Sequence, residues 1–233
     1  MAALSQDFSV KPGRGQVIAG IVWFLFYTFL LGLLIPAVLS IAGMQINAAL
    51  VNGIYFIIGF LGTVLLLFPF LSRSIDGLVS EPLRVIKAIL LSYIIYEVFL
   101  VGFQLLLQVV YPSFYTPNDE TVTAVASENY GLMWAGAVLL GPVTEETLVR
   151  GLIFGSLREK SRPAGYVISA LIFAAMHIYQ YLGDMLPADI LVNIIIYGFP
   201  GMVFCFCYEY AGTIWAPIIL HMILNAISMQ AIS

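Results

Sequence analysis

The sequence predicts an all-α fold, a polytopic bundle of about seven transmembrane helices, with eight as the alternative count. The chain has 233 residues, of which 61% are hydrophobic and only 9% are charged, and its mean hydropathy is +1.01. A soluble domain carries roughly 25% charged residues. The apolar runs also reach the roughly 17–25 residues that are needed to cross a bilayer. These observations indicate an integral membrane protein rather than a globular domain with a large core.

The apolar runs give the expected order of the helices. The polar segment 72–84 should lie along the membrane surface, and the first run is long enough to hide a break, which gives the count an error of one. Pro200-Gly201 should kink or break the sixth span, because proline lacks a backbone N–H. The expected spans are 17–44, 49–71, 85–111, 131–157, 163–182, 188–208 and 212–232.

The cations predict the orientation in the membrane. Cytoplasmic loops carry an excess of Lys and Arg. The loop cations lie before the first span, between the second and third, and between the fourth and fifth, and with seven spans these three segments fall on one side of the membrane. The N-terminus is therefore expected in the cytoplasm and the acidic segment 112–130 outside, in a membrane that fits a prokaryotic plasma membrane. The net charge of −4 argues against a nucleic-acid partner. The loop cations are Lys11, Arg14, Arg73, Arg84, Lys87, Arg158, Lys160 and Arg162.

The ninth cation, Arg150, lies inside the fourth apolar run, close to Glu145 and Glu146. A charge inside a membrane costs about 2.5–3.5 kcal/mol on insertion scales, so such residues usually face the protein interior and serve a function. Glu146 and Arg150 are four residues apart and can pair on one helix face. Glu145 is turned by about 100° from its neighbour and can point elsewhere.

Two histidines and an asparagine reach a similar depth in other spans. At 1.5 Å per residue, Glu145 lies roughly 20 Å before Arg158, and His177 lies roughly 20 Å into the fifth run. His221 and Asn225 lie roughly 14 and 20 Å into the seventh run. A single intramembrane His or Asn more often only joins helices. Ionisable groups from three helices at one depth instead predict a shared polar pocket, expected near the cytoplasmic half of the bilayer.

Three short motifs in this region resemble a known family. Together with the Gly-Thr-Ile-Trp-Ala-Pro stretch at 212–217, they are similar to the signatures of the CAAX-protease and bacteriocin-processing family (CPBP, or Abi) of intramembrane proteases, over residues 131–228. The resemblance implies a glutamate-dependent, metal-independent endopeptidase acting on a membrane-associated peptide, such as a lipidated CAAX-type, leader or bacteriocin-type peptide. The motifs are Glu145-Glu146-x-x-x-Arg150, Phe173-x-x-x-His177 and His221-x-x-x-Asn225.

The resemblance also suggests how the chain is divided. Residues 1–130, which contain no such motif, are expected to supply three N-terminal helices and the outer loop. Residues 131–233 are expected to supply the catalytic helices. The two parts should form one structural unit, because no soluble domain or low-complexity linker separates them.

Hydrolysis by an activated water needs a base, a group that positions the water, and donors for the developing oxyanion. In this hypothesis Glu145 is the base and His177 orients the water or relays its proton. His221 and Asn225 aim N–H donors at the oxyanion. Arg150 neutralises the neighbouring carboxylate and holds the helix geometry. No cofactor is expected.

Three alternative functions stay open. Zinc held by Glu145, His177 and His221 would be a catalytic ligand set with an open position, although the sequence lacks a His-Glu-x-x-His motif. A proton-coupled transporter also carries charges within its spans, although the internal repeat that is common in transporters is not visible. A non-catalytic immunity or scaffold protein of the membrane is the third alternative.

The other polar residues of the spans are expected to be structural. Glu97 should bond to a neighbouring helix, with a role in the substrate pocket as the alternative. Cys205 and Cys207 point to different faces of a helix, so neither a disulfide between them nor a metal site is expected. Ser92 and Ser169 are interpreted as helix-packing residues.

Overall fold

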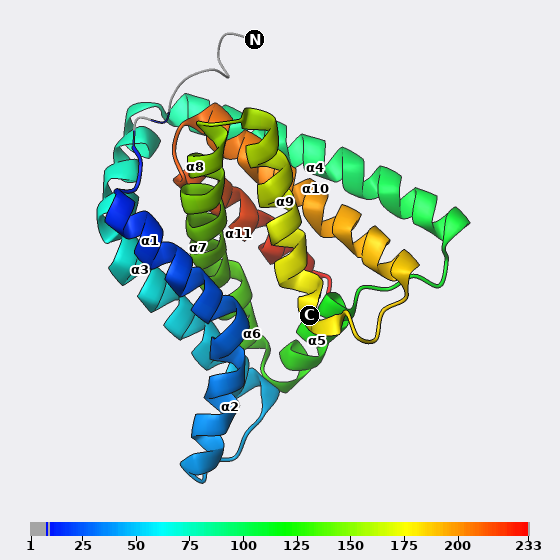
Figure 1. Cartoon of the computed structure of the whole chain (residues 1–233). Coiled ribbons are helices and arrows are strands. Elements are labelled where there is room, and N and C mark those ends of the chain that lie inside the picture. The colour runs from blue at the N-terminus through cyan, green and yellow to red at the C-terminus, as the bar shows by residue number, and fades with distance from the viewer. Residues whose placement is uncertain (1–7, 9, 233) are drawn as a thin grey trace.

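The computed structural model describes residue 8 and residues 10–232, and within these residues every regular element is a helix (Figure 1). The elements are α1 (Arg14–Leu25), η2 (Phe26–Leu31), α2 (Gly32–Ile41), α3 (Ala48–Ser80), α4 (Pro82–Val110), α5 (Pro117–Glu128), α6 (Tyr130–Trp134), η3 (Ala135–Leu140), α7 (Gly141–Glu146), η4 (Thr147–Phe154), α8 (Gly155–Arg158), α9 (Arg162–Ile178), η5 (Tyr179–Tyr181), α10 (Pro187–Ala211) and α11 (Trp215–Gln230).

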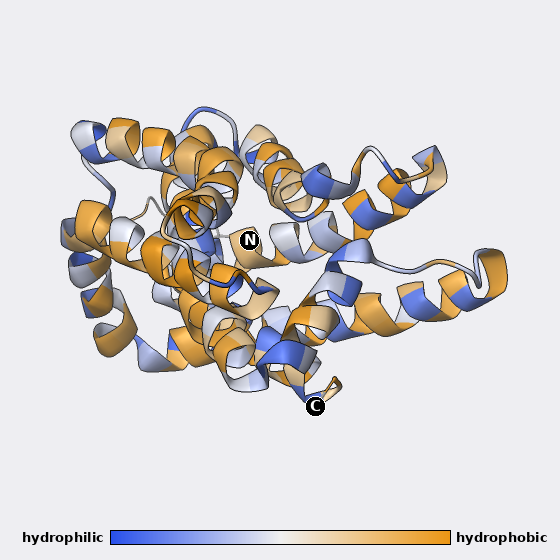
Figure 2. Ribbon diagram, turned by 90° about the horizontal axis from the view of Figure 1, so that it is seen from below, coloured by the Kyte–Doolittle hydropathy of each residue, from blue (hydrophilic) through white to orange (hydrophobic). Residues whose placement is uncertain are grey.

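Among the described residues, six continuous helical segments are long and apolar enough to cross a membrane, which makes the chain an integral membrane protein. Hydrophobic positions predominate along these helices, as Figure 2 shows. The six spans are Arg14–Ile41, Ala48–Ser80, Pro82–Val110, Tyr130–Arg158, Arg162–Tyr181 and Pro187–Ala211.

The expected seventh span, 212–232, is the shorter helix α11. Its 16 residues extend for roughly 24 Å at 1.5 Å per residue, which is less than a bilayer core requires. The helix contacts α3, α4, α7 and α10 and buries residues such as Ile218 and Leu220. The predicted helical bundle is thus confirmed, with α11 enclosed by longer helices.

Two expected irregularities are absent. Residues 72–80 do not lie along the surface but continue α3 to Ser80, and the helix stops at Glu81. Pro82 explains this end, because a proline disfavours helical geometry in the residue before it. Pro200-Gly201 does not interrupt α10, which runs through both residues. Membrane helices commonly tolerate such a proline, because neighbouring helices form hydrogen bonds with the backbone groups that it leaves unpaired.

The fourth span is irregular where the charged motif lies. Two π-helical segments, η3 and η4, flank α7, which carries Glu145 and Glu146. Pro142 in α7 lacks an N–H, and its ring crowds the carbonyl of Val138 four residues earlier. This crowding explains why the helix widens before α7. Such π segments frequently occur at functional sites.

The fourth span lies between two groups of helices. Helices α1 and α3 pack on one side of it, while α9, α10 and α11 pack on the other (Figure 1). Leu148 and Leu152 share an apolar cluster with Tyr27 of the first span. A second cluster joins Phe173, Phe204 and Leu220 from α9, α10 and α11. Helices from both halves of the sequence therefore surround the motif, while the proposed division at residue 130 stays a prediction.

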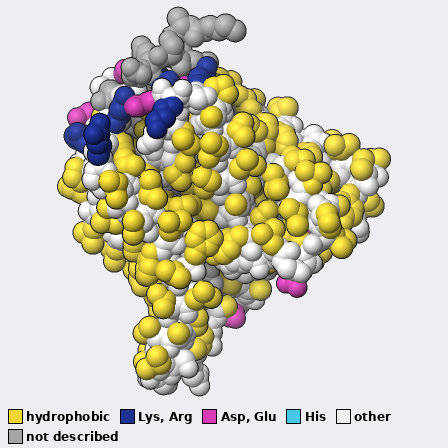
Figure 3. Space-filling model, viewed as in Figure 1, with side chains coloured by type: hydrophobic (Ala, Val, Ile, Leu, Met, Phe, Trp, Pro, Cys, Tyr) yellow, Lys and Arg dark blue, Asp and Glu magenta, His cyan; other side chains and the backbone are white. Residues whose placement is uncertain are grey.

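The cationic end of the bundle is held by one buried carboxylate. Glu209 near the end of α10 accepts hydrogen bonds from Arg158 Nε at 2.5 Å and from Arg162 Nη2 at 2.8 Å. The Tyr166 hydroxyl donates a third bond to Glu209 at 2.7 Å. These contacts join α8, α9 and α10. The Lys and Arg side chains visible in Figure 3 gather at one end of the molecule.

The close approach of α9 and α10 depends on Gly201. A Cβ atom at this position would lie 3.0 Å from the Cα of Ala170 and 3.4 Å from Arg150 Nη2. We expect Gly201→Ala to lower the free energy of unfolding by about 1–3 kcal/mol, as overpacking does. Thermal unfolding in detergent measures the change.

Gly198→Ala is the matched control on the same helix, because its Cβ would make only an ordinary contact, 3.9 Å from the carbonyl oxygen of Ala170. Equal melting temperatures for the two variants would contradict the packing explanation.

Candidate functional site

Glu146 lies in a fully buried cluster of polar groups. Its Oε1 atom accepts a hydrogen bond from Arg150 Nη1 at 3.0 Å and lies 2.9 Å from Nδ1 of His221. Arg150 is also fully buried, and its Nη2 donates to the carbonyl oxygen of Gly201 at 3.1 Å. The expected pair between Glu146 and Arg150 is therefore present. The cluster therefore joins four elements, because Glu146 of α7 and Arg150 of η4 contact Gly201 of α10 and His221 of α11.

Aromatic rings enclose the Arg150 guanidinium. Its central carbon lies 4.3 Å from the ring centroid of Phe173 and 5.0 Å from that of Phe204. The Phe204 ring also stacks on His221, with centroids 4.7 Å apart and planes at 23°. Cation–π attraction strengthens when the cation is removed from water. The rings thus stabilise a charge that Glu146 alone would only partly compensate.

Glu145 has a different environment from its neighbour. Its side chain is only partly buried, and its Oε1 atom lies near Gly141, where a Cβ would approach it to 3.4 Å. Oε2 is buried and has no hydrogen-bond partner among the described residues. The carboxylate interacts electrostatically with Tyr27, Tyr55 and His177. The two adjacent carboxylates therefore face different partners, as the 100° rotation between them predicts.

His177 is oriented by a backbone group of its own helix. Its Nδ1 atom lies 2.8 Å from the carbonyl oxygen of Phe173. A carbonyl oxygen only accepts, so Nδ1 carries the hydrogen, and in the neutral ring the lone pair resides on Nε2. The ring also stacks on Tyr197, with centroids 4.6 Å apart and planes at 15°. Nε2 is thus the ring nitrogen left for chemistry.

His221 and Asn225 each have one side-chain nitrogen engaged by another helix. Nδ1 of His221 is engaged by Glu146, and Nδ2 of Asn225 donates to the carbonyl oxygen of Ala137 at 2.8 Å. Their four-residue spacing puts both on one helix side, but different neighbouring helices meet each of them. One amide hydrogen of Asn225 and Nε2 of His221 remain for other partners.

His177 lies farther from the cationic end of the bundle than expected for a pocket near the cytoplasmic half of the bilayer. It is the penultimate residue of α9 and lies fifteen residues after Arg162, or roughly 22 Å along the helix. Arg162 belongs to the cationic end. The imidazole therefore lies toward the opposite end of the bundle, where α5 and the acidic segment are found.

The residues of the zinc alternative are not gathered into a ligand set. Within the described part of the chain, no group of three His, Cys, Asp or Glu side chains is placed to hold a metal ion. Glu145 interacts electrostatically with His177, whereas His221 bonds to Glu146.

Sequence reasoning missed several residues that complete the site. Gly201 provides a carbonyl oxygen to Arg150, and Phe204 and Tyr197 provide ring surfaces to the guanidinium and to His177. Tyr27 and Tyr55, which stack on each other at 4.6 Å, belong to the region without assigned motifs. No spacing signal identifies them, because their partners come from other helices.

The remaining candidates lie apart from this cluster. Glu97 interacts with Tyr93 and Tyr96 of its own helix, α4. Cys205 and Cys207 are buried and free, in agreement with the expectation of no disulfide between them.

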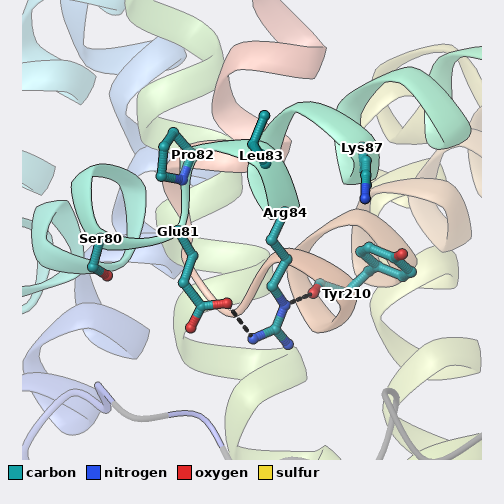
Figure 4. A pocket seen from close by; sticks show the side chains of 7 residues that line it. All are labelled: Ser80, Glu81, Pro82, Leu83, Arg84, Lys87 and Tyr210. Atoms are coloured by element: carbon teal, nitrogen blue, oxygen red, sulfur yellow. Dashed lines mark hydrogen bonds and ion pairs between the residues drawn. The ribbon is translucent and has the colours of Figure 1, made fainter.

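Two cavities at the ends of the bundle are not lined by the candidate residues. One, of about 490 Å³, lies at the junction of α3 and α4, where the Arg84 guanidinium bonds to Glu81 and to the backbone carbonyl of Tyr210 (Figure 4). The other, of about 380 Å³, lies at the opposite end, between α5 and the connection from η5 to α10.

The chain is similar to known proteins across the segment that carries the three motifs. Residues 127–227 match the family model described as Type II CAAX prenyl endopeptidase Rce1-like. The chain is 35% identical over 96 residues to the Bacillus subtilis (strain 168) protein named "Putative membrane peptidase YdiL". This similarity covers 40% of the chain and 34% of that relative, so the chain spans about a third of the relative's length. No solved structure matches the chain.

The buried ion pair provides a test of the site's structural basis. We expect Arg150→Leu to lower the free energy of unfolding by about 3–5 kcal/mol, because removing one partner leaves an uncompensated buried charge. The double variant Glu146→Gln/Arg150→Met should recover most of the loss, since both charges are then removed. Chemical or thermal unfolding in detergent measures both.

Lys160→Leu serves as the control, because Lys160 is an exposed cation and surface substitutions usually change stability by no more than about 0.5 kcal/mol. A double variant as unstable as Arg150→Leu would show that charge compensation is not the cause.

Proposed function

We propose that this chain, which belongs through residues 127–227 to the Rce1-like family of type II CAAX prenyl endopeptidases, is an intramembrane endopeptidase in which Glu145 activates water. The substrate class is a membrane-associated peptide, with or without a lipid anchor. A site enclosed by membrane helices supports this class, because the cleaved segment must itself enter the bundle from the bilayer or its surface.

The different surroundings of the two adjacent glutamates support the assignment of the base most strongly. Oε1 of Glu146 is paired with Arg150 and with His221, which commits this oxygen to structure. Oε2 of each glutamate is buried without a partner among the described residues, but it is Glu145 that interacts electrostatically with His177. A general base must be free to accept a proton from water within hydrogen-bond reach.

The reaction consumes one water molecule. Glu145 takes a proton from water as the water oxygen bonds to the carbonyl carbon of the scissile peptide, and the carbonyl oxygen becomes the oxyanion. The protonated Glu145 then gives this proton to the leaving nitrogen as the C–N bond breaks. A carboxylic acid and an amine are the products. His177 accepts a hydrogen bond from the water at Nε2 and orients it.

Stabilisation of the oxyanion needs N–H donors directed at the point where charge develops. The remaining amide hydrogen of Asn225 can serve this role while the other bonds to Ala137. His221 can donate from Nε2 only as an imidazolium, because its Nδ1 hydrogen is directed at Glu146.

We further propose that catalysis proceeds without a resident metal and that the cationic end of the bundle faces the cytoplasm of a prokaryotic cell. The gathering of cations at one end supports the orientation, with the N-terminus inside. The lack, among the described residues, of three His, Cys, Asp or Glu side chains placed together to hold a metal ion supports the first point. Activity of the purified protein should survive prolonged dialysis against a chelator; loss of activity that added zinc restores would contradict it.

Substitution of the proposed base provides the main test. We expect Glu145→Gln to reduce cleavage of a farnesylated CAAX-type peptide at least 10³-fold, on the order of the 10²–10⁴-fold that acid–base catalysis contributes, and His177→Ala to act in the same direction. Mass spectrometry of the peptide measures cleavage. Melting temperatures and elution profiles in detergent check that both variants fold.

Glu97→Gln is the matched control, because Glu97 is another carboxylate within a membrane span but lies beside tyrosines of α4. It should retain activity within a factor of about two, as expected when no contact of the transition state is lost. Should wild type leave the CAAX-type peptide intact, membrane peptides that accumulate in cells carrying Glu145→Gln identify another substrate. Full activity of Glu145→Gln would overturn the mechanism.

A further inference from the structure

The face of the His177 ring is covered by Tyr197 of α10. The two rings are nearly parallel, with planes at 15° and centroids 4.6 Å apart. A second restraint acts within the plane of the His177 ring, because its Nδ1 atom lies 2.8 Å from the Phe173 carbonyl oxygen. The orientation of Nε2 therefore depends on where the Tyr197 ring is held.

Tyr197 is in turn held by α5. Its hydroxyl donates a hydrogen bond to Oδ1 of Asp119 at 3.1 Å, and Thr116 and Asn118 interact with the same hydroxyl. Asp119 lies in the first turn of α5. A tyrosine ring that is fixed both by stacking and by its hydroxyl loses the freedom to rotate away from its neighbour.

Helix α5 is itself fastened to the bundle at both ends. The Tyr181 hydroxyl donates to Oγ1 of Thr121 at 2.8 Å, and Glu128 accepts a bond from the backbone N–H of Ala49 at 2.9 Å. Val125 and Ala126 are buried against neighbouring helices. Asp119 is thus presented from a rigid element rather than from a free loop.

We propose that Asp119 and Tyr197 are positioning residues that hold the His177 imidazole with Nε2 directed at the reacting water. The inference rests on the proposed function and adds two residues to its machinery. Asp119 lies outside residues 127–227, the part that matches the family model. Residues outside the matched segment therefore complete the site through α5.

The size of the effect follows from the geometry of proton transfer. Misplacement of a reacting group by about 1 Å can cost roughly 10²-fold in rate. Loss of the hydroxyl bond alone leaves the stacked ring in place and should cost less than loss of the ring. A positioning role lowers kcat and leaves KM unchanged, since neither residue is assigned a contact with the peptide.

Kinetics of purified variants test the proposal with the same farnesylated peptide. We expect Tyr197→Phe and Asp119→Ala each to lower kcat by about tenfold, and Tyr197→Leu by about 100-fold, with unchanged KM. The double variant Asp119→Ala/Tyr197→Phe should be no slower than either single variant, because both remove the same bond.

Tyr111→Phe is the matched control, since it also removes a bond from a tyrosine hydroxyl to an aspartate, here Asp189 at 2.8 Å, which is not among the bonds that hold His177, Tyr197 or α5. It should keep the kcat of the wild type. Wild-type kcat in both Tyr197→Phe and Asp119→Ala, or an equal loss in Tyr111→Phe, would overturn the positioning role.

A second measurement does not depend on cleavage. Diethylpyrocarbonate modifies neutral imidazole nitrogens, and peptide mass spectrometry separates His177 from His221. Modification of His177 should accelerate at least threefold in Tyr197→Leu, where the ring face is uncovered, relative to Tyr111→Phe. If the wild type cleaves no peptide while this acceleration is seen, the proposed function fails and the positioning contact stands. Equal rates would contradict the contact itself.

Discussion

The neutralisation of Glu146 inside the membrane is the interaction on which the rest of the site depends. A buried carboxylate is tolerated only when charged or polar donors surround it. Arg150 comes from the same span, His221 comes from α11, and the guanidinium reaches the carbonyl oxygen of Gly201 on α10. The need to compensate one charge therefore fixes the relative positions of three helices, and α11, too short to span the bilayer by itself, is held at their centre.

The two adjacent glutamates lie on a single helical turn but have different neighbours. Glu146 bonds to His221 of α11, while Glu145 interacts electrostatically with Tyr27 of the first span and with His177 of α9. The π segments that flank α7 set the rotation of the helix at this point. Two neighbouring residues of the same type thereby acquire different surroundings. Oε1 of Glu146 is bonded to Arg150 and His221, while Oε2 of each glutamate has no hydrogen-bond partner among the described residues.

The region outside the family match contributes more than a membrane anchor. Tyr27 and Tyr55 of the first two spans interact with Glu145, and Asp119 of α5 bonds to the tyrosine that covers His177. The surroundings of Glu145 and His177 are thus formed by the whole bundle rather than by the matched segment alone.

The sequence by itself determined the membrane character, the all-helical fold, the pairing of Glu146 with Arg150 and the contact of Phe173 with His177, whose rings lie 4.5 Å apart. These features follow from composition and from four-residue spacing within one helix, which are local properties. Only the tertiary structure decided that His221 meets Glu146, that Asn225 meets Ala137 and that Tyr197 covers His177. Such contacts depend on the rotation and axial shift of one helix against another, and packing among all the helices sets both.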